Sequence, residues 1–260
     1  MINKRRHFLK SSLAAGVAPF ISGGIAGAQI IGANNRLRLA VAGLNGRGKS
    51  HIDGFLGQKG VEIAYLIDPD KNVLAQRMAD LRKKVEGKGL PFTTKGVSDV
   101  REALGDKNLD ALSIATPNHW HSLMTIWAAQ AGKHVYVEKP MSHDVEEGRV
   151  AVAAQKKYGV VIQHGTQRRS DKNIAALHEM IKAGTWGKLK VAYGYCCKPR
   201  GGIGTKGIAS PPENLDWNTW KGPAVIDDYH ANYVHYNWHW FWESGNGDLN
   251  NQGTHQLDVA

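Results

Sequence analysis

The stretch Val135-Tyr136-Val137-Glu138-Lys139-Pro140 decides the fold of this chain. Its first three residues are β-branched or aromatic and follow a turn at Gly132 and Lys133, which predicts a buried strand. The strand ends on an acid, a lysine and a proline, and open parallel sheets bind ligands at the carboxyl ends of their strands. Because proline restricts the backbone of the residue before it, Lys139 is predicted to be aimed at one place. A surface lysine in a strand-to-helix turn is the plainer alternative, and the flanking sequence decides between the two.

A glycine-rich turn follows an apolar strand predicted over Leu37 to Ala42. It reads Gly43-Leu44-Asn45-Gly46-Arg47-Gly48 and leads into a helix predicted over Lys49 to Gly57. The turn matches the dinucleotide pattern G-x-G-x-x-G except at its middle position, where Asn45 stands beside a glycine. Small residues here let the backbone approach a pyrophosphate at the helix N-terminus, and Arg47 could add a phosphate contact. The alternative is a glycine-rich turn in some other α/β sheet.

The second predicted strand, Val61 to Ile67, ends in Asp68. An acid at this point fits a ligand for the ribose hydroxyls of a dinucleotide. Its carboxylate would repel a 2′-phosphate, so NAD is the predicted cofactor and NADP is less favoured.

Strands and helices keep alternating further along the chain. Helices are predicted over Lys71 to Val85, up to Ala131 and over Asp144 to Tyr158, and strands over Asp110 to Ala115 and Val160 to His164. This alternation predicts an α/β fold with a doubly wound parallel sheet, a Rossmann domain over residues 36–164.

Composition excludes several classes of protein. The 260 residues are 42% hydrophobic, which is typical of a globular protein. The net charge is +10, and losing the four positive charges of an amino-terminal presequence would leave +6, which suits an anionic ligand. Without a basic helix or arginine-rich run, no nucleic acid partner is expected. The adjacent Cys196 and Cys197 would point to opposite faces of a strand, which speaks against a mutual disulfide, and no metal-binding spacing is present.

The amino terminus has the pattern of an export signal. Lys4-Arg5-Arg6-His7-Phe8-Leu9-Lys10 is a charged region, Ser11 to Ala33 carries no charge, and Ala26-Gly27-Ala28 offers a cleavage site. We therefore predict a signal over residues 1–28 and a linker over 29–35. The arginine pair with Phe-Leu-Lys resembles a twin-arginine signal, which implies the export machinery as a partner and a periplasmic location.

Two alternatives to the twin-arginine signal stay open, an ordinary secretory signal and an uncleaved membrane anchor. Pro19 and five glycines make the apolar run a poor spanning helix. No stable membrane span is therefore expected after cleavage. A protein without a working signal would stay in the cytoplasm.

Further motifs flank the opening stretch. Ala115-Thr116-Pro117-Asn118, with His121, ends one predicted strand, and Gly132-Lys133-His134-Val135 leads into Glu138-Lys139-Pro140. Together these motifs resemble the glucose-fructose oxidoreductase / inositol dehydrogenase (Gfo/Idh/MocA) family, and the resemblance covers Arg36 to Ala260. It implies that Lys139 is catalytic and that the peptide before Pro140 is cis. The residues expected to bind the cofactor are Gly43, Asn45, Gly46, Arg47, Gly48, Asp68, Thr116, Pro117, Asn118, His121, Glu138 and Lys139.

The resemblance also implies a second domain over residues 165–260, for substrate binding and for assembly into a homo-oligomer. It is expected to be α+β, with a mostly antiparallel sheet that is incomplete in this chain. Ile181 to Leu189 resembles the family's entry into that domain. Arg168 and a basic loop with Lys198 and Arg200 are candidate substrate contacts, and plain solvated side chains are the alternative.

Residues His235 to Glu243 alternate in a way that predicts a strand. Aromatic side chains, Tyr236, Trp238, Trp240 and Trp242, would share one face of it. They could stack on a sugar ring, or form sheet core or an oligomer interface. His235 and His239 would lie too far apart to share one metal, so no metal site is predicted.

The segment Asn250 to Asp258 resembles the family's D-x-G-x-H-x-x-D element. His255 is present and so is Asp258, a candidate substrate contact, but Asn251 replaces the first acid. An amide cannot take a proton, so Asn251 is expected only to orient a substrate or Lys139 by hydrogen bonds. His255 is the predicted proton carrier beside Lys139, and a structural histidine is the alternative.

The function that this resemblance implies is hydride transfer between a secondary alcohol of a carbohydrate and NAD, with the cofactor retained. Two other classes stay open. One is a redox-neutral glycoside hydrolase or lyase, similar to NAD-dependent α-N-acetylgalactosaminidases, whose T-H-x-L segment Thr254, His255 and Leu257 match. The other is a binding protein that keeps the fold without chemistry.

Overall fold

The computed structural model describes residues 36–260, and the predicted export signal and linker lie outside the described residues. Its strands are β1 (Leu37–Ala42), β2 (Val61–Ile67), β3 (Lys95–Val97), β4 (Ala111–Ile114), β5 (His134–Glu138) and β6 (Ile162–Gly165). Its α-helices are α2 (Arg47–Leu56), α3 (Lys71–Glu86), α4 (Val100–Leu104), α5 (His121–Gln130), α6 (Val145–Tyr158), α7 (Lys172–Lys182), α8 (Trp217–Lys221), α9 (Gly247–Asn251) and α10 (Gly253–Val259). Three single-turn helices are η3 (Asn118–Trp120), η4 (Gln167–Ser170) and η5 (Asn237–Trp240).

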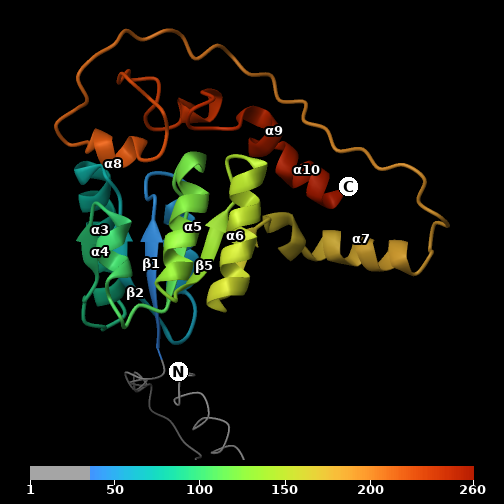
Figure 1. Cartoon of the computed structure of the whole chain (residues 1–260). Helices are drawn as coiled ribbons and strands as arrows, with labels where there is room; N and C mark the ends of the chain where they lie inside the picture. The colour runs from blue at the N-terminus through green and yellow to red at the C-terminus, as the bar shows by residue number, and fades with distance from the viewer. Residues whose placement is uncertain (1–35) are drawn as a thin grey trace, which may run out of the picture. The chain divides into compact units, whose positions relative to one another are not determined.

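The six strands form one parallel sheet in the order β3-β2-β1-β4-β5-β6 (Figure 1). The chain winds outward from β1 in one direction and from β4 in the other. The carboxyl ends of β1 and β4 are therefore neighbours at the point where such a sheet binds ligands. The doubly wound parallel sheet predicted from the alternating pattern is confirmed.

The core lies on both faces of this sheet. Leu39 and Val41 of β1 pack with apolar side chains of α2 and α3. Ala40 and Ala42 of the same strand pack on the other face with side chains of α4 and α5. Because successive side chains of a strand point to opposite faces, the uninterrupted apolar run of β1 buries both sets.

Aspartates begin the longer helices of the Rossmann part. Asp70 accepts hydrogen bonds from two backbone N–H groups at the start of α3, and Asp144 accepts one at the start of α6. Both side chains satisfy N–H groups that the helix itself leaves without a partner. Asp70 lies in the short loop between β2 and α3, so its cap also fixes the loop that carries Asp68.

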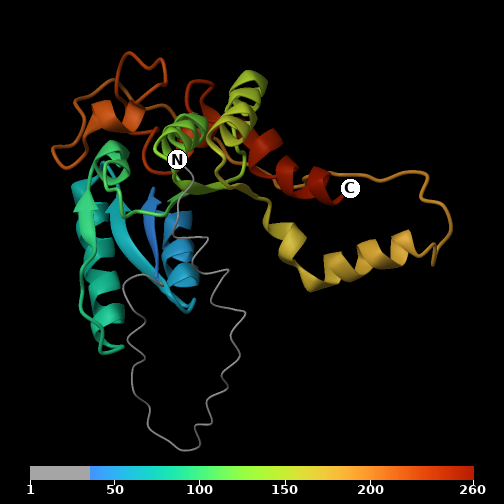
Figure 2. The ribbon, with the colours of Figure 1, turned by 60° about the horizontal axis from the view of Figure 1, so that its bottom comes forward.

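Residues 183–260 contribute no strand to the sheet of the described residues. The mostly antiparallel sheet expected there does not form within this range. Its entry, the stretch after α7, is extended but has no partner strand, and a strand needs one to satisfy its backbone groups. Figures 1 and 2 both show α7 leading away from the sheet, with the extended stretch returning from its end.

The strand predicted over His235 to Glu243 is wrong. The chain there makes the short helix η5, and its aromatic residues share no face. Trp238 packs against a buried aromatic cluster, whereas Trp242 is 91% exposed. The alternating pattern did not produce a strand because side chains of this segment pack against Trp220 and Tyr233, and this packing bends the chain. Within the described residues, no neighbouring strand pairs with the segment to keep it extended.

Residues 36–260 contain neither a membrane-spanning helix nor a cluster of metal-binding side chains. No helix in this range has the length and apolar character needed to cross a membrane. No group of three or more His, Cys, Asp or Glu side chains is arranged there to hold a metal ion.

Candidate active site and dinucleotide site

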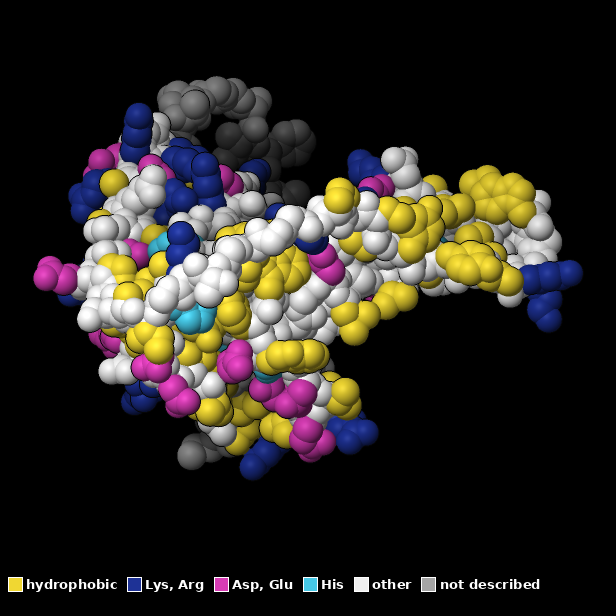
Figure 3. Space-filling model, turned by 90° about the horizontal axis from the view of Figure 1, so that it is seen from above, with side chains coloured by type: hydrophobic (Ala, Val, Ile, Leu, Met, Phe, Trp, Pro, Cys, Tyr) yellow, Lys and Arg dark blue, Asp and Glu magenta, His cyan; other side chains and the backbone are white. Residues whose placement is uncertain are grey.

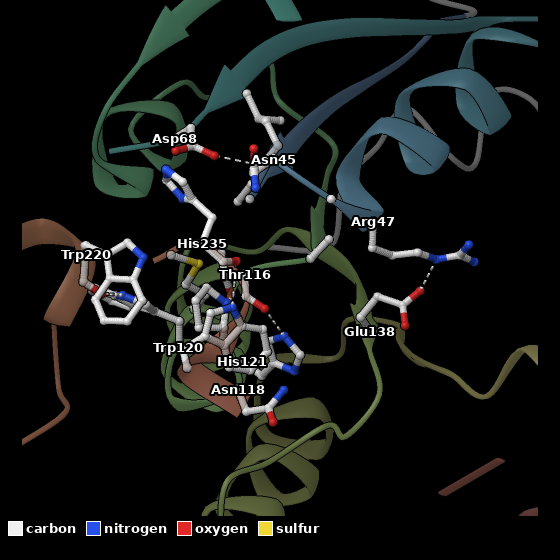
Figure 4. Close-up of a pocket in the computed structure, with 18 of the residues that line it drawn as sticks. Asn45, Arg47, Asp68, Thr116, Asn118, Trp120, His121, Glu138, Trp220 and His235 are labelled. Atoms are coloured by element: carbon white, nitrogen blue, oxygen red, sulfur yellow. Dashed lines mark hydrogen bonds and ion pairs between the residues drawn. The ribbon is translucent and has the colours of Figure 1, made fainter. Parts of the chain in front are cut away.

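A cavity of about 400 Å³ lies at the carboxyl ends of the parallel strands (Figure 4). Eleven of the twelve residues predicted to bind the cofactor line it, together with Lys139's predicted partners Asn251 and His255. The remaining one, Gly48, lies inside the first turn of α2. The structure therefore brings the glycine-rich turn, the acid after β2 and the E-K-P motif into one place.

The glycine-rich turn packs closely against the neighbouring backbone and leaves room for a ligand at the start of α2. Gly43 has φ +80°, and a Cβ there would lie 2.5 Å from the carbonyl oxygen of Ala115. A Cβ on Gly48 would lie 1.9 Å from the carbonyl oxygen of Gly43. A Cβ on Gly46 would meet nothing within 4 Å, and no side chain caps α2 there. The first N–H groups of α2 thus face open space, which fits a pyrophosphate.

Asp68 stands at the end of β2 beside this turn. Its two carboxylate oxygens accept hydrogen bonds from the N–H groups of Leu44, at 2.8 Å, and Asp70, at 3.0 Å. Burial raises the pKa of the Asp68 carboxyl, and these two donors oppose the shift. The two bonds fix the carboxylate against the turn, with lone pairs left for ribose hydroxyls. The turn and Asp68 together fit a dinucleotide.

Glu138 is the centre of a buried hydrogen-bond network. Its Oε1 accepts from Arg47 Nε at 2.9 Å, from His51 Nε2 at 3.1 Å and from Gln167 Nε2 at 2.6 Å. Its Oε2 accepts from Gln167 Nε2 at 2.8 Å and from the N–H of Lys139 at 3.2 Å. Burial would raise the pKa of Glu138, but the hydrogen bonds and charges of His51 and Arg47 outweigh it and lower the pKa to about 2. Glu138 is thus a fixed anion directly before the lysine.

Arg47 was predicted to contact a phosphate, and here it is bound to Glu138 (Figure 4). Its side chain is half exposed and lines the cavity. His51 and Gln167 also bind Glu138, and neither was predicted from the sequence. His51 follows Arg47 by four residues on α2, so both point from one helix face. Gln167 follows the carboxyl end of β6, which is a ligand-binding position in such a sheet.

Lys139 is held by Asn251. The Lys139–Pro140 peptide is cis, as the resemblance implied. Lys139 Nζ donates to the backbone oxygen of Asn251 at 2.6 Å and to its Oδ1 at 2.9 Å. Burial lowers the pKa of Lys139, and the charge of Arg47 adds to this while that of Glu138 opposes it. A lysine so placed is aimed into the cavity and releases its proton more readily than a surface lysine.

His255, on α10, lines the same cavity. Burial lowers its pKa, and the positive charge of Lys139 lowers it further. Its Nδ1 is buried without a hydrogen-bond partner among the described residues, so Nε2 is the nitrogen that can meet a ligand. The ring is therefore neutral near pH 7 and able to accept a proton.

The motif around His121 ties two strand ends together. His121 Nε2 lies 2.8 Å from the carbonyl oxygen of Thr116, and Nδ1 lies 2.5 Å from that of Pro140. The ring is fully buried, and burial lowers the pKa of His121. His121 thus links the turn after β4 to the turn after β5. Thr116, Pro117 and Asn118 line the cavity beside it (Figure 4).

Four predicted substrate contacts do not line this cavity. Arg200 pairs with Asp248 through two bonds of 2.8 Å and lies over the ring of Trp240. Asp258 binds Arg169 and lines a second, more open hollow with it. Arg168 lies 4.0 Å from Asp171, and Lys198 is exposed.

The carboxyl-terminal part of the chain adds residues to the cavity that the sequence analysis did not assign to it. They are Thr219, Trp220, His235, Tyr236, Trp238 and His239. The clustering of Trp, Tyr and His was visible in the sequence, but a strand prediction placed those side chains on a sheet face. The only available signal was composition, which does not say which side chains meet.

Comparison with known proteins identifies two matching family descriptions. Residues 37–166 match the description "Oxidoreductase family, NAD-binding Rossmann fold" and residues 183–260 match "Oxidoreductase family, C-terminal alpha/beta domain". The first match contains the glycine-rich turn, Asp68 and Lys139. The second contains Asn251 and His255.

Three known proteins illustrate the similarity. The chain is 34% identical over 155 residues to scyllo-inositol 2-dehydrogenase (NAD(+)) of Bacillus subtilis, covering 59% of this chain and 42% of that protein. It is 31% identical over 160 residues to alpha-N-acetylgalactosaminidase of Shewanella oneidensis, covering 55% and 35%. The WlbA dehydrogenase of Bordetella pertussis, solved with NADH and UDP-GlcNAcA, has TM-score 0.62 at 23% identity, covering 87% and 54%. This last likeness shows the fold.

The chain spans between 26% and 51% of the length of four curated relatives that it matches. The shared part holds the cavity, and NAD is the cofactor that the matching Rossmann family binds.

Proposed function

The chain belongs to the Gfo/Idh/MocA oxidoreductase family, and from that premise we propose that it oxidises a secondary alcohol of a sugar or cyclitol with NAD. One observation carries this proposal. Lys139 and His255 line the same cavity as the glycine-rich turn and Asp68. A hydrogen-bond donor and a proton acceptor thus lie beside a dinucleotide site. The inositol dehydrogenase among the relatives supports a polyhydroxylated substrate.

Each residue has a defined part in the proposed reaction. Bound NAD supplies the acceptor for the hydride. Lys139 Nζ donates a hydrogen bond to the substrate oxygen and stabilises its developing negative charge. His255 Nε2 takes the hydroxyl proton, because the lowered pKa keeps its ring neutral. Asn251 accepts from Lys139 Nζ and so holds it in place.

Lys139→Met tests the assignment. The variant and the unaltered protein are incubated with NAD and a panel of inositols and monosaccharides, and NADH absorbance is followed. The variant should turn over at least ~10²-fold more slowly, the usual scale for a proton-transfer group, while NAD affinity stays within a few fold. Lys172→Met, at an exposed position on α7, is the matched control. Near-normal turnover by Lys139→Met would end the assignment.

A second candidate is redox-neutral cleavage of a glycoside. The similarity to alpha-N-acetylgalactosaminidase favours it, as does the segment Thr254-His255-Gln256-Leu257. In this reaction a ring carbon is oxidised, the aglycone leaves by elimination, and the ring is reduced again, so no net NADH forms. Incubation with aryl glycosides and no added cofactor separates the two. Release of the aglycone without NADH would favour cleavage over the dehydrogenase.

Export with a bound cofactor fits redox-neutral cleavage. It also fits oxidation of the sugar alcohol if a second carbonyl substrate then takes the hydride back from the bound NADH, whereas a dehydrogenase that releases NADH in each turnover fits poorly. We propose a periplasmic protein that is carried across the membrane folded, on the strength of Arg5-Arg6 and the apolar run after them. A cofactor loaded before export has to stay bound, which requires a dissociation constant of roughly nanomolar or lower, about −12 kcal/mol. Cell fractionation tests this: an Arg5→Lys, Arg6→Lys double variant should stay in the cytoplasm. Unchanged export of that variant, or cofactor-free protein from the periplasm, would contradict the proposal.

A homo-oligomer is the proposed assembly. Leu189, Val191, Tyr193 and Tyr195 alternate along the extended stretch after α7 and are each more than half exposed. Figure 3 shows hydrophobic side chains gathered along the arm that α7 and this stretch form. An exposed apolar row of this kind is typical of an interaction surface. Light scattering on Val191→Asp should show a smaller particle than the unaltered protein; a monomer in both cases would refute this assembly.

A further inference from the structure

The part of the cavity nearest Asp68 is covered by side chains from the carboxyl-terminal part of the chain. If Asp68 binds the ribose of the adenosine half of a dinucleotide, the adenine base lies next to Asp68, on the side away from the glycine-rich turn. The walls there come from the Rossmann part and include Val100, Trp120 and Met124. The covering side chains, Thr219, Trp220 and His235, come from a segment far along the chain from these walls. Figure 4 shows His235 beside Asp68, and Trp220 beside Trp120.

This covering segment, residues 212–241, is bound to the loop that carries Asp68. The N–H of Lys71 donates to the carbonyl oxygen of Asn214 at 2.8 Å. The N–H of Asp216 donates to the carbonyl oxygen of Pro69 at 3.0 Å, and Leu215 forms an antiparallel bridge with Asp70. Residues 214–216 thus pair in strand fashion with the loop after β2. We call residues 212–241 the roof.

Side chains add a second attachment. His235 Nε2 lies 3.0 Å from Asp70 Oδ2. On the other side of the cavity, the indole N–H of Trp120 donates to the carbonyl oxygen of Trp220 at 2.9 Å. A Cβ on Gly222 would lie 2.0 Å from the ring of Trp120, so the roof backbone rests directly on that ring. The roof is therefore fixed on both sides of the adenosine end.

The roof has its own apolar core. Leu215, Trp220, Ile226, Tyr229 and Tyr233 are all buried in one cluster. The rings of Trp217 and Trp220 are stacked with centroids 4.9 Å apart. A segment packed in this way moves as a unit, and it opens only when several hydrogen bonds break together.

We propose that the roof is part of the cofactor site, with Thr219, Trp220 and His235 contacting the adenosine half of NAD. The inference rests on the NAD-dependent function proposed above and adds residues from outside the Rossmann domain to the cofactor site. It has a kinetic consequence. Because the roof closes the cavity at the adenosine end, NAD leaves only when the roof lifts, so dissociation is slow.

The test uses ADP-ribose, which carries the adenosine and both phosphates but no nicotinamide. Its affinity is measured by calorimetry on the full chain and on three variants. His235→Ala removes a contact, and Thr219→Phe places a ring in the adenosine space. Lys172→Met, at an exposed position on α7, is the control, while thermal unfolding of each variant checks that it folds.

The two roof variants should bind ADP-ribose at least about tenfold more weakly, the scale of one lost buried hydrogen bond, and release it faster. Lys172→Met should bind it as the unaltered protein does. Amides of residues 214–222 should also exchange hydrogen more slowly once ADP-ribose is bound. Unchanged affinity in both roof variants would overturn the inference and leave the proposed function standing. An unaltered protein that binds neither ADP-ribose nor NAD would overturn both.

Discussion

Glu138→Gln is expected to destabilise the protein and to remove part of its acid sensitivity. The pKa of Glu138 is lowered from its ordinary 4.5 to about 2. This difference corresponds to about 3 kcal/mol of folding free energy at neutral pH, since each unit is about 1.4 kcal/mol. The carboxylate is 5% exposed, so solvent screens this energy little. Glutamine keeps the shape but turns an N–H₂ group toward donors on Arg47 and His51.

The sign of the pH effect follows from the lowered pKa. The stabilisation is fully present above about pH 4.5 and is lost as pH falls through about 2. About 2 kcal/mol of it should be gone at pH 3. The stability difference between the unaltered protein and Glu138→Gln should therefore shrink from about 3 to about 1 kcal/mol between pH 7 and pH 3.

Urea unfolding followed by circular dichroism at pH 7, 5, 4 and ~3 measures this difference. Glu146→Gln, an exposed glutamate on α6, is the matched control and should stay within about 0.5 kcal/mol of the unaltered protein at every pH. A Glu138→Gln protein that is as stable as the unaltered one at pH 7 would refute the reasoning. A stability difference that does not depend on pH would also refute the reasoning, because it would show that the hydrogen-bond partners of Glu138 do not lower its pKa.

Three more outcomes are expected. Gly48→Ala should abolish NAD binding, because its Cβ would overlap the carbonyl oxygen of Gly43, whereas Gly46→Ala, whose Cβ meets open space, should still fold with an unchanged melting temperature. Asp68→Ser should raise the affinity for NADP relative to NAD by about tenfold in calorimetric titrations, since a carboxylate that repels the 2′-phosphate is gone; an unchanged ratio would contradict that role. His255→Gln should lower kcat/KM by about 10²-fold and remove the acid limb of its pH profile, which lies below 6.5 because the pKa of His255 is lowered; a retained limb would assign the titration to another group.

The residues of the candidate site that belong to short sequence patterns could be predicted from the sequence. The glycine-rich turn, Asp68, Thr116–Asn118 and Lys139 each directly follow a strand of a parallel sheet, and such strands end at a common edge. Their meeting therefore follows from the order of strands and helices alone. Asn251 and His255 came from the resemblance of Asn250 to Asp258 to a family motif, because nothing in the local pattern places these residues beside Lys139.

Other contacts had no local signal. Arg47 and Glu138 are 91 residues apart in the chain, and Lys139 and Asn251 are 112 apart. The charge of Arg47 suggested a phosphate partner, and its pairing with Glu138 could not be read from the sequence. Residues His235 to Glu243 showed a strand pattern, and the aromatic cluster around Trp220 overruled it.

The sequence by itself determined the doubly wound sheet and the end of it that binds a ligand. Helix and strand periodicities and turn residues act over a few neighbouring residues, so they can be read along the chain. Only the tertiary structure decided which charges pair, and that residues 212–241 cover the end of the cavity beside Asp68. Hydrogen bonds and packing act over a few ångströms, and residues far apart in sequence come within that range only after the chain has folded.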